Sequence, residues 1–290
     1  MKNSLKDSGS FCQSIKNHFC RFLFRVKPSA AAYFLKKQIR GSGSMKKLII
    51  NADDFGYSRG VNYGIIDAYK LGILTSATFM ANMPGAGHAA RLARESPGLG
   101  IGVHLVLTCG RPLLSDHRTI IDAKGNFRNL AFYQGAFTID ADEVYREWKA
   151  QIETCINMGL EPDHLDSHHH INAYPGISDA FLTLAKEYRL PVRRNMESVA
   201  ITEKGVKTTD SFSSVLEAAL KDEEAVSELF EEHDTVEVMT HPAYLDKELL
   251  TNSSYTYPRV DELEFLTDPD VVIRLNKLAD VQLVSFRNLT

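Results

Sequence analysis

The sequence predicts an α/β protein whose parallel strands alternate with helices and close into a barrel. Short apolar runs alternate with segments of helical periodicity over roughly 250 residues. Histidines and acids follow several of those runs, as expected where the strands of a barrel end at one face. No glycine-rich dinucleotide fingerprint follows the first run, which counts against a nucleotide-binding fold. A doubly wound open sheet is the alternative.

The first half begins with an apolar, β-branched run at residues 46–50. Helical spacing of Val61, Ile65 and Ala68 predicts a helix over 61–71. We predict further strands over 76–81 and 99–108, and a short helix over 88–95 after a Pro-Gly turn. Residues 111–138 show no period and are predicted to be a loop or lid near a site.

The second half begins with a helix over 140–158, which has acids in its first turn, one apolar stripe and a stop at Gly159. The remaining strands are predicted over 163–170, 190–194, 235–240 and 281–286. The remaining helices are predicted over 177–188, 213–232 with one break, 260–266 and 270–279. Residues 197–212 favour neither state.

Composition indicates an ordinary globular protein. Of 290 residues, 44% are hydrophobic and 24% are charged, and the net charge of -4 favours neither nucleic acid nor a membrane surface as a partner. The four cysteines have neither disulfide-framework nor zinc-finger spacing. We therefore expect a cytoplasmic protein. A homodimer is the expected assembly.

Residues 1–44 differ from the rest. They hold nine Lys or Arg and a single acid, and they end in a Gly-Ser-Gly-Ser linker directly before Met45. We predict a fused or disordered basic leader, followed by one domain over 45–290. A targeting or membrane-surface arm is the alternative, although no apolar run there is long enough to span a membrane. The predicted catalytic residues all lie beyond Ser44, so deleting the leader should preserve folding and activity.

An acidic pair, Asp53 and Asp54, follows the first predicted strand. Neighbouring side chains on an extended chain point in opposite directions, so the two acids are expected to have different roles. One can hold a metal while the other acts as a base. A helix cap with a solvated charge is the alternative.

His104 lies on the glycine face of the third predicted strand, together with Gly100 and Gly102. The opposite face is leucine-rich and requires cover by helices. The glycine face leaves room into which His104 can project. The alternative is a core histidine bonded to a backbone carbonyl.

The run HLDSHHH at 164–170 concentrates three histidines. Strand alternation would place Asp166, His168 and His170 on one face, and such a cluster is costly to bury without a function. His/Asp clusters bind metals readily. A surface histidine-rich turn is the alternative.

Two further strand ends carry candidate residues. Proline at 242 restricts His241 to an extended conformation at the end of its strand. Arg193 and Arg194 end another strand, where an arginine can orient a carboxylate or remain a solvated charge. In a barrel all these ends meet at one face, and two histidines with one carboxylate would leave open coordination positions on a metal.

The order of these motifs resembles that of the YdjC-like carbohydrate deacetylases, which include the chitooligosaccharide deacetylases. The resemblance covers essentially all of 45–290 through NADDFG at 51–56, GVHL at 102–105, HLDSHHH at 164–170 and MTHP at 239–242. It implies a single-domain distorted (β/α) barrel related to the polysaccharide deacetylases. It also implies one divalent metal, Mg²⁺ ahead of Zn²⁺, on Asp54, His104 and His168, with Asp53 as the base.

We therefore predict a metal-dependent hydrolase that removes N-acetyl groups from N-acetylglucosamine units of small oligosaccharides and releases acetate. His241 is the predicted acid, and Arg193 would orient Asp53 or contact substrate. The predicted substrate-binding residues are His170, Asp166 and Tyr174. The alternatives are a metal-dependent phosphoesterase or amidohydrolase, and a carbohydrate-binding protein without catalytic activity.

Overall fold

A computed structural model describes residues 45–196 and 198–289, in which a seven-stranded parallel sheet forms the centre. The strands are β1 (Lys46–Phe55), β2 (Ser76–Phe79), β3 (Gly100–Leu105), β4 (Leu165–Ser167), β5 (Ser211–Ser213), β6 (Thr235–Thr240) and β7 (Val281–Leu283). Their order is β4-β3-β2-β1-β6-β5, and β7 pairs with the start of β1. Isolated parallel bridges link Leu165 to Val192 and Val192 to Thr208, which draws the two edges together. The prediction of a distorted (β/α) barrel is confirmed.

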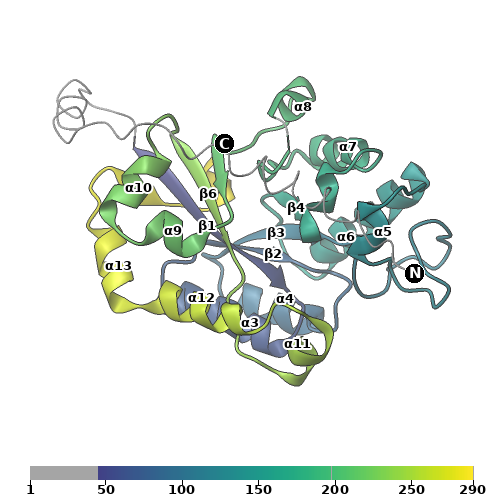
Figure 1. The fold of residues 1–290 in the computed structure, drawn as a ribbon, viewed down its shortest axis with the longest axis horizontal. Coiled ribbons are helices and arrows are strands. Elements are labelled where there is room, and N and C mark those ends of the chain that lie inside the picture. The colour runs from purple at the N-terminus through teal and green to yellow at the C-terminus, as the bar shows by residue number, and fades with distance from the viewer. Residues whose placement is uncertain (1–44, 197, 290) are drawn as a thin grey trace, which may run out of the picture. The chain divides into compact units, whose positions relative to one another are not determined.

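Helices cover the outside of this sheet. They are α3 (Arg59–Leu71), α4 (Ala86–Arg94), α5 (Leu130–Gln134), α6 (Ala141–Asn157), α7 (Ser178–Tyr188), α8 (Ser198–Glu203), α9 (Leu216–Leu220), α10 (Glu223–Leu229), α11 (Lys247–Asn252), α12 (Tyr257–Thr267) and α13 (Pro269–Asn276). Within the described residues, the 3-10 helices η2 (His168–Ala173) and η3 (Phe286–Leu289) follow β4 and β7. Figure 1 shows α3, α4, α11 and α12 together beside β1 and β2, and α6 and α7 beside β3 and β4.

β1 is the central strand. It pairs with β2, β6 and β7, and Leu48, Ile49 and Ile50 are completely buried. Burial on both faces explains why this segment is continuously apolar rather than alternating. The strand runs to Phe55, five residues beyond the predicted end, so the acidic pair lies inside it.

Five predicted strands are shorter in the structure, among them those predicted over 76–81 and 99–108, which end at Phe79 and Leu105. The strand predicted over 163–170 ends at Ser167, because His169 and His170 have positive φ angles (57° and 54°) that no strand accommodates. The strand predicted over 190–194 is reduced to bridges at Val192, and the one predicted over 281–286 ends at Leu283. The predicted break in the 213–232 helix is confirmed by the separation of α9 and α10.

The irregular segment predicted over 111–138 is hydrogen-bonded to side chains along one face of α6, here called its stripe. Glu143 and Glu147 accept hydrogen bonds from backbone amides of this segment. Gln151 lies on the same stripe, one turn after Glu147, and hydrogen-bonds to both the amide and the carbonyl of Val106. The stripe therefore fixes the loop and the chain that leaves β3, two residues after His104.

Replacing Glu147 by Ala should destabilise the domain. Its buried carboxylate accepts from the amides of Leu113 and Leu114, from His117 and from Gln151. The substitution leaves several buried donors without an acceptor, so we expect the free energy of unfolding to fall by about 3 kcal/mol. Denaturant unfolding of the apoprotein measures this. Glu153→Ala, on the exposed face of the same helix, should change it by about 0.5 kcal/mol or less.

No helix within 45–196 and 198–289 is long and apolar enough to cross a membrane. The predicted leader lies outside the described residues, and its role stays a prediction, as do the cytoplasmic location and the homodimer.

Candidate active site

A cavity of about 440 Å³ opens where the carboxyl ends of the strands meet. Its lining comes from β1, β3 and β6 with the residues that follow them, from η2, and from the segment that runs from the end of α11 into α12. It comprises Asp53, Asp54, Tyr57, His104, Thr108, Cys109, His168, His169, His170, Met239, His241, Asn252, Ser253, Ser254, Tyr255 and Arg259. The candidate residues of four distant motifs are thereby brought together at one face of the barrel.

A bulge in β1 presents both acids to this cavity. The pairing of β1 with β2 shifts register between Ala52 and Phe55, and Asp54 has a φ of 71°. This left-handed conformation is one that Asp tolerates better than most residues. Strand alternation therefore fails at this point, and the expected opposite orientation of the two acids is wrong: both line the same cavity. Their partners nevertheless differ.

Gly56 completes the turn after the acids. Its φ is 112°, and a Cβ there would lie 2.8 Å from the Met80 carbonyl oxygen. Its amide donates to Asn62 Oδ1 (2.7 Å), and Ser58 caps the N-terminus of α3. These contacts fix the backbone directly after the bulge, which limits the conformational freedom of Asp54.

Three donor atoms converge beside this bulge. Asp54 Oδ1 lies 3.1 Å from His168 Nδ1 and 3.4 Å from His104 Nε2, and the two ring nitrogens are 3.3 Å apart. Tetrahedral ligands at bond lengths of about 2.0–2.1 Å are separated by roughly 3.3 Å. Asp54 Oδ1 is buried and accepts no well-oriented hydrogen bond from the described residues. This buried Asp/His group can hold a metal ion.

The electrostatics of the group also suit a cation. Burial alone would lower the pKa of His104, but Asp166 and Asp53 raise it well above its ordinary value. Burial likewise opposes protonation of His168, yet Cys109 and Asp54 raise its pKa to about 9. Both rings therefore lie where negative surroundings stabilise positive charge, whether a proton or a metal supplies it.

Asp166 lies behind His104, outside the cavity wall. It is fully buried, and its Oδ1 is 2.7 Å from His104 Nδ1. A carboxylate in this position fixes the ring and directs Nε2 toward the metal group. The predicted contact of Asp166 with substrate is therefore not supported by its position, because β4 directs this side chain into the barrel interior.

Asp53 is held by Arg193. Two parallel hydrogen bonds of 2.7 and 2.6 Å join Arg193 Nη1 and Nη2 to the Asp53 carboxylate. Burial would raise the pKa of Asp53, but Arg193 and neighbouring histidines hold it far below its ordinary value. Arg193 also bridges Asp166 (2.9 Å) and Glu237 (2.8 Å). It is fully buried and outside the cavity lining, so its position supports orientation of Asp53 rather than substrate contact.

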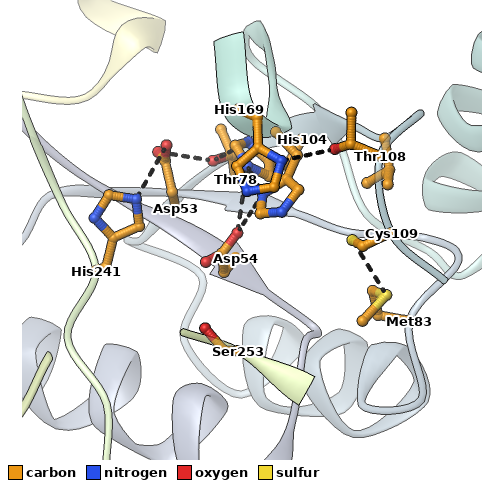
Figure 2. Close-up of polar contacts among 12 residues, drawn as sticks. Asp53, Asp54, Thr78, Met83, His104, Thr108, Cys109, His169, His241 and Ser253 are labelled. Carbon is orange, nitrogen blue, oxygen red and sulfur yellow. Dashed lines mark hydrogen bonds and ion pairs between the residues drawn. The ribbon is translucent and has the colours of Figure 1, made fainter. Parts of the chain in front are cut away.

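His241 lies beside the Oδ2 oxygen of Asp53. Its Nε2 lies 3.8 Å from Asp53 Oδ2, and Figure 2 shows the imidazole and Thr78 on opposite sides of that carboxylate. The ring reaches the cavity from the end of β6, as predicted for a residue before proline. Burial lowers its pKa despite the nearby carboxylates, which favours a neutral imidazole that can accept a proton.

Of the other two predicted substrate-binding residues, one lines the cavity and one does not. His170 lines the cavity and accepts a hydrogen bond from the Asn195 amide (2.9 Å), and burial lowers its pKa to about 4. Tyr174 is absent from the lining; it packs near Phe137, with ring centroids 6.4 Å apart. The predicted contact between Tyr174 and substrate is therefore not supported.

Several lining residues were missed by the sequence analysis. His169 stands 2.9 Å from the Thr108 hydroxyl, and burial lowers its pKa to about 3. Its place in the histidine run was the only available signal. Arg259 donates to Asp54 Oδ2 (2.6 Å) from α12, where nothing in the helical pattern distinguishes it from a surface arginine. Residues 252–255 form the wall facing Asp54, where Figure 2 places Ser253.

Comparisons with known proteins point to one family. The profile described as YdjC-like protein matches residues 47–277. A protein of Brevibacillus brevis named carbohydrate deacetylase is 42% identical over 250 residues, covering 84% of this chain and 99% of its own. One of Geobacillus stearothermophilus, with the same name, is 43% identical over 244 residues, covering 82% and 96%. A solved Enterococcus faecalis structure, named for a provisional role in cellobiose-phosphate cleavage, has 33% identity and a TM-score of 0.76, covering 85% and 100%.

Proposed function

This chain belongs to the YdjC-like protein family, and from that premise we propose that it is a metal-dependent carbohydrate deacetylase. It would remove N-acetyl groups from N-acetylglucosamine units of small oligosaccharides, such as chitooligosaccharides, and release acetate. The observation that carries the proposal is the position of Asp53 directly beside the Asp54, His104 and His168 donor group. Relatives that match nearly their whole length are named carbohydrate deacetylases.

Asp54, His104 and His168 would hold one divalent ion. Two imidazole nitrogens and one carboxylate are a donor set found in catalytic zinc sites, while Mg²⁺ prefers oxygen donors. We therefore keep Zn²⁺ beside the Mg²⁺ that the family resemblance puts first. An ion bound there polarises an acyl carbonyl and lowers the pKa of a water molecule.

Asp53 would act as the general base. Its two hydrogen bonds to Arg193 fix the carboxylate plane, and Oδ2 remains on the side of His241. His241 Nε2 lies 3.8 Å from Asp53 Oδ2, so the proton that Asp53 takes from the attacking water would pass to this imidazole. Protonated His241 would then deliver that proton to the departing sugar nitrogen.

The cavity wall favours a neutral sugar over a phosphate ester. Among the described lining residues Arg259 is the only Lys or Arg; its Nη2 is paired with Asp54, and its Nη1 has no hydrogen-bond partner among the described residues. A phosphoesterase site would be expected to offer further cationic donors. A carbohydrate-binding protein without catalytic activity is also disfavoured, because the base and the complete donor group are assembled together.

The test is acetate release from N-acetylated chitooligosaccharides by the purified protein. We expect release with added Mg²⁺ or Zn²⁺ and its loss after chelation, with recovery when one of the two ions is restored. Phosphorylated disaccharides, with and without an acetamide, form the comparison arm. Phosphate release without acetate release would replace the proposal with a phosphoesterase, and metal-supplied protein inactive on every acetylated sugar would contradict it.

A further inference from the structure

Helix α12 directs two charged side chains toward the site. Arg259 and Glu262 are three positions apart on this helix and therefore share a face. Arg259 is only 3% exposed, an unusual degree of burial for an arginine. Each of the two side chains contacts a different part of the proposed machinery.

Arg259 grips the metal-ligand carboxylate from behind. Its Nη2 donates to Asp54 Oδ2 at 2.6 Å, while Asp54 Oδ1 faces the two histidines. Its Nε donates to the backbone carbonyl of Tyr255 at 2.7 Å, which anchors the guanidinium on the cavity wall. The Asp54 carboxylate is thereby prevented from turning Oδ2 toward the donor group.

Glu262 grips the end of β6. Its Oε2 accepts hydrogen bonds from the Thr240 hydroxyl (2.6 Å) and from the backbone amide of His241. Its Oε1 accepts from the Tyr255 hydroxyl (2.6 Å), whose ring stands edge-on to His241 with centroids 5.5 Å apart. The backbone and one ring face of His241 are therefore both set through Glu262.

We propose that Arg259 and Glu262 form a clamp, in which one residue positions the metal-ligand carboxylate and the other positions the proton carrier. Neither has to touch the reacting atoms. Arg259 holds Oδ2 of Asp54, so that only Oδ1 faces His104 and His168. Glu262 keeps His241 close to Asp53. The role of Glu262 rests on the proposed function, whereas the role of Arg259 rests on the donor group alone.

The Arg259 half is tested by metal affinity, which needs no turnover. Apoprotein is titrated with Zn²⁺ and with Mg²⁺ by calorimetry or competition with a chelating dye. Because outer-shell partners of metal ligands typically contribute about 10–100-fold, Arg259→Met should bind more weakly by that factor. Arg259→Lys keeps the charge but cannot hold Tyr255 and Asp54 together, so it should recover only part of the affinity. Arg91→Met on the surface of α4 should bind like wild type.

The Glu262 half is tested by separating kcat from KM at saturating metal. In Glu262→Ala, misplacement of His241 should lower kcat by roughly 10–100-fold while KM and metal affinity stay unchanged. Glu262→Gln retains one acceptor oxygen and should stay within several-fold of wild type. Glu264→Ala, exposed on the same helix, is the matched control. Thermal unfolding of every variant confirms that the protein is folded.

The proposed roles of Arg259 and Glu262 can be refuted independently of each other and of the proposed function. Folded Arg259→Met and Arg259→Lys proteins with wild-type metal affinity would overturn the first role. A Glu262→Ala protein with unchanged kcat, or with KM alone altered, would overturn the second. Equal losses of metal affinity in both positions would indicate a common packing defect and overturn the clamp. A wild-type protein that releases no acetate would refute the deacetylase, while the metal titrations would still decide the role of Arg259.

Discussion

Asp53→Asn is expected to lower kcat by about 10²–10⁴-fold while the metal stays bound. The amide keeps the shape of the carboxylate but removes the proton acceptor. Arg193 retains Asp166 and Glu237 as partners, so its position should change little. Asp54 is held from the other side by Arg259, which leaves the donor group intact. Metal content by mass spectrometry and acetate release together measure the outcome.

Asp54→Ala should fail in the opposite way. It removes one of three protein donor atoms and leaves the buried Arg259 without its carboxylate. Metal affinity should fall sharply, and excess metal should restore part of the activity if the remaining histidines still capture the ion. Restoration by metal is the feature that separates a lost ligand from a lost base.

The control is Asp179→Asn, at an exposed carboxylate on α7. It should retain both metal and turnover. Loss of metal from Asp53→Asn with retention by Asp54→Ala would show that the two roles are reversed. Retention of metal and full activity by both would show that the acidic pair is not the catalytic centre.

The fold and the main candidate residues were predictable because they depend on local pattern. Strand-length apolar runs precede the site residues on β1, β3 and β6, and a barrel brings such ends together whatever their separation in the chain. His104 follows from the glycine face of its strand, and His241 from the proline after it. Both line the cavity as expected.

The prediction that failed is the assignment of side chains to strand faces by period-two alternation. It assumes extended backbone, but Asp54, His169 and His170 have positive φ angles. After Ser167 the chain enters a 3-10 helix, so all three histidines reach the cavity while Asp166 points into the barrel. Such conformations concentrate at functional sites, where tertiary contacts impose them, and a periodicity rule cannot anticipate them.

The clamp could not have been predicted from the sequence. Arg259 meets Asp54 across 205 positions of the chain, and its helix carries charged residues on several sides. No spacing rule connects them, because the contact exists only once α12 has packed beside α3. Arg193 was predicted to orient Asp53 or contact substrate, but no sequence signal indicated its further carboxylate partners, Asp166 on β4 and Glu237 on β6.

Arg193→Met is expected to destabilise the domain by about 3–5 kcal/mol, the usual cost of removing one partner from a buried ion pair. The guanidinium is fully buried among Asp53, Asp166 and Glu237, and the substitution leaves these carboxylates facing one another without a cation. Denaturant unfolding of the apoprotein measures the loss, and Arg274→Met, whose guanidinium bonds only the Leu220 carbonyl among the described residues, serves as the control.

A second substitution tests the cause. If repulsion among the carboxylates is responsible, Arg193→Met combined with Glu237→Gln should recover part of the lost stability, since one negative group is removed. Turnover should not recover, because Asp53 still lacks the two hydrogen bonds that orient it. Additive losses in the double variant would contradict the charge-balance explanation. Full activity of folded Arg193→Met would contradict the orienting role of Arg193.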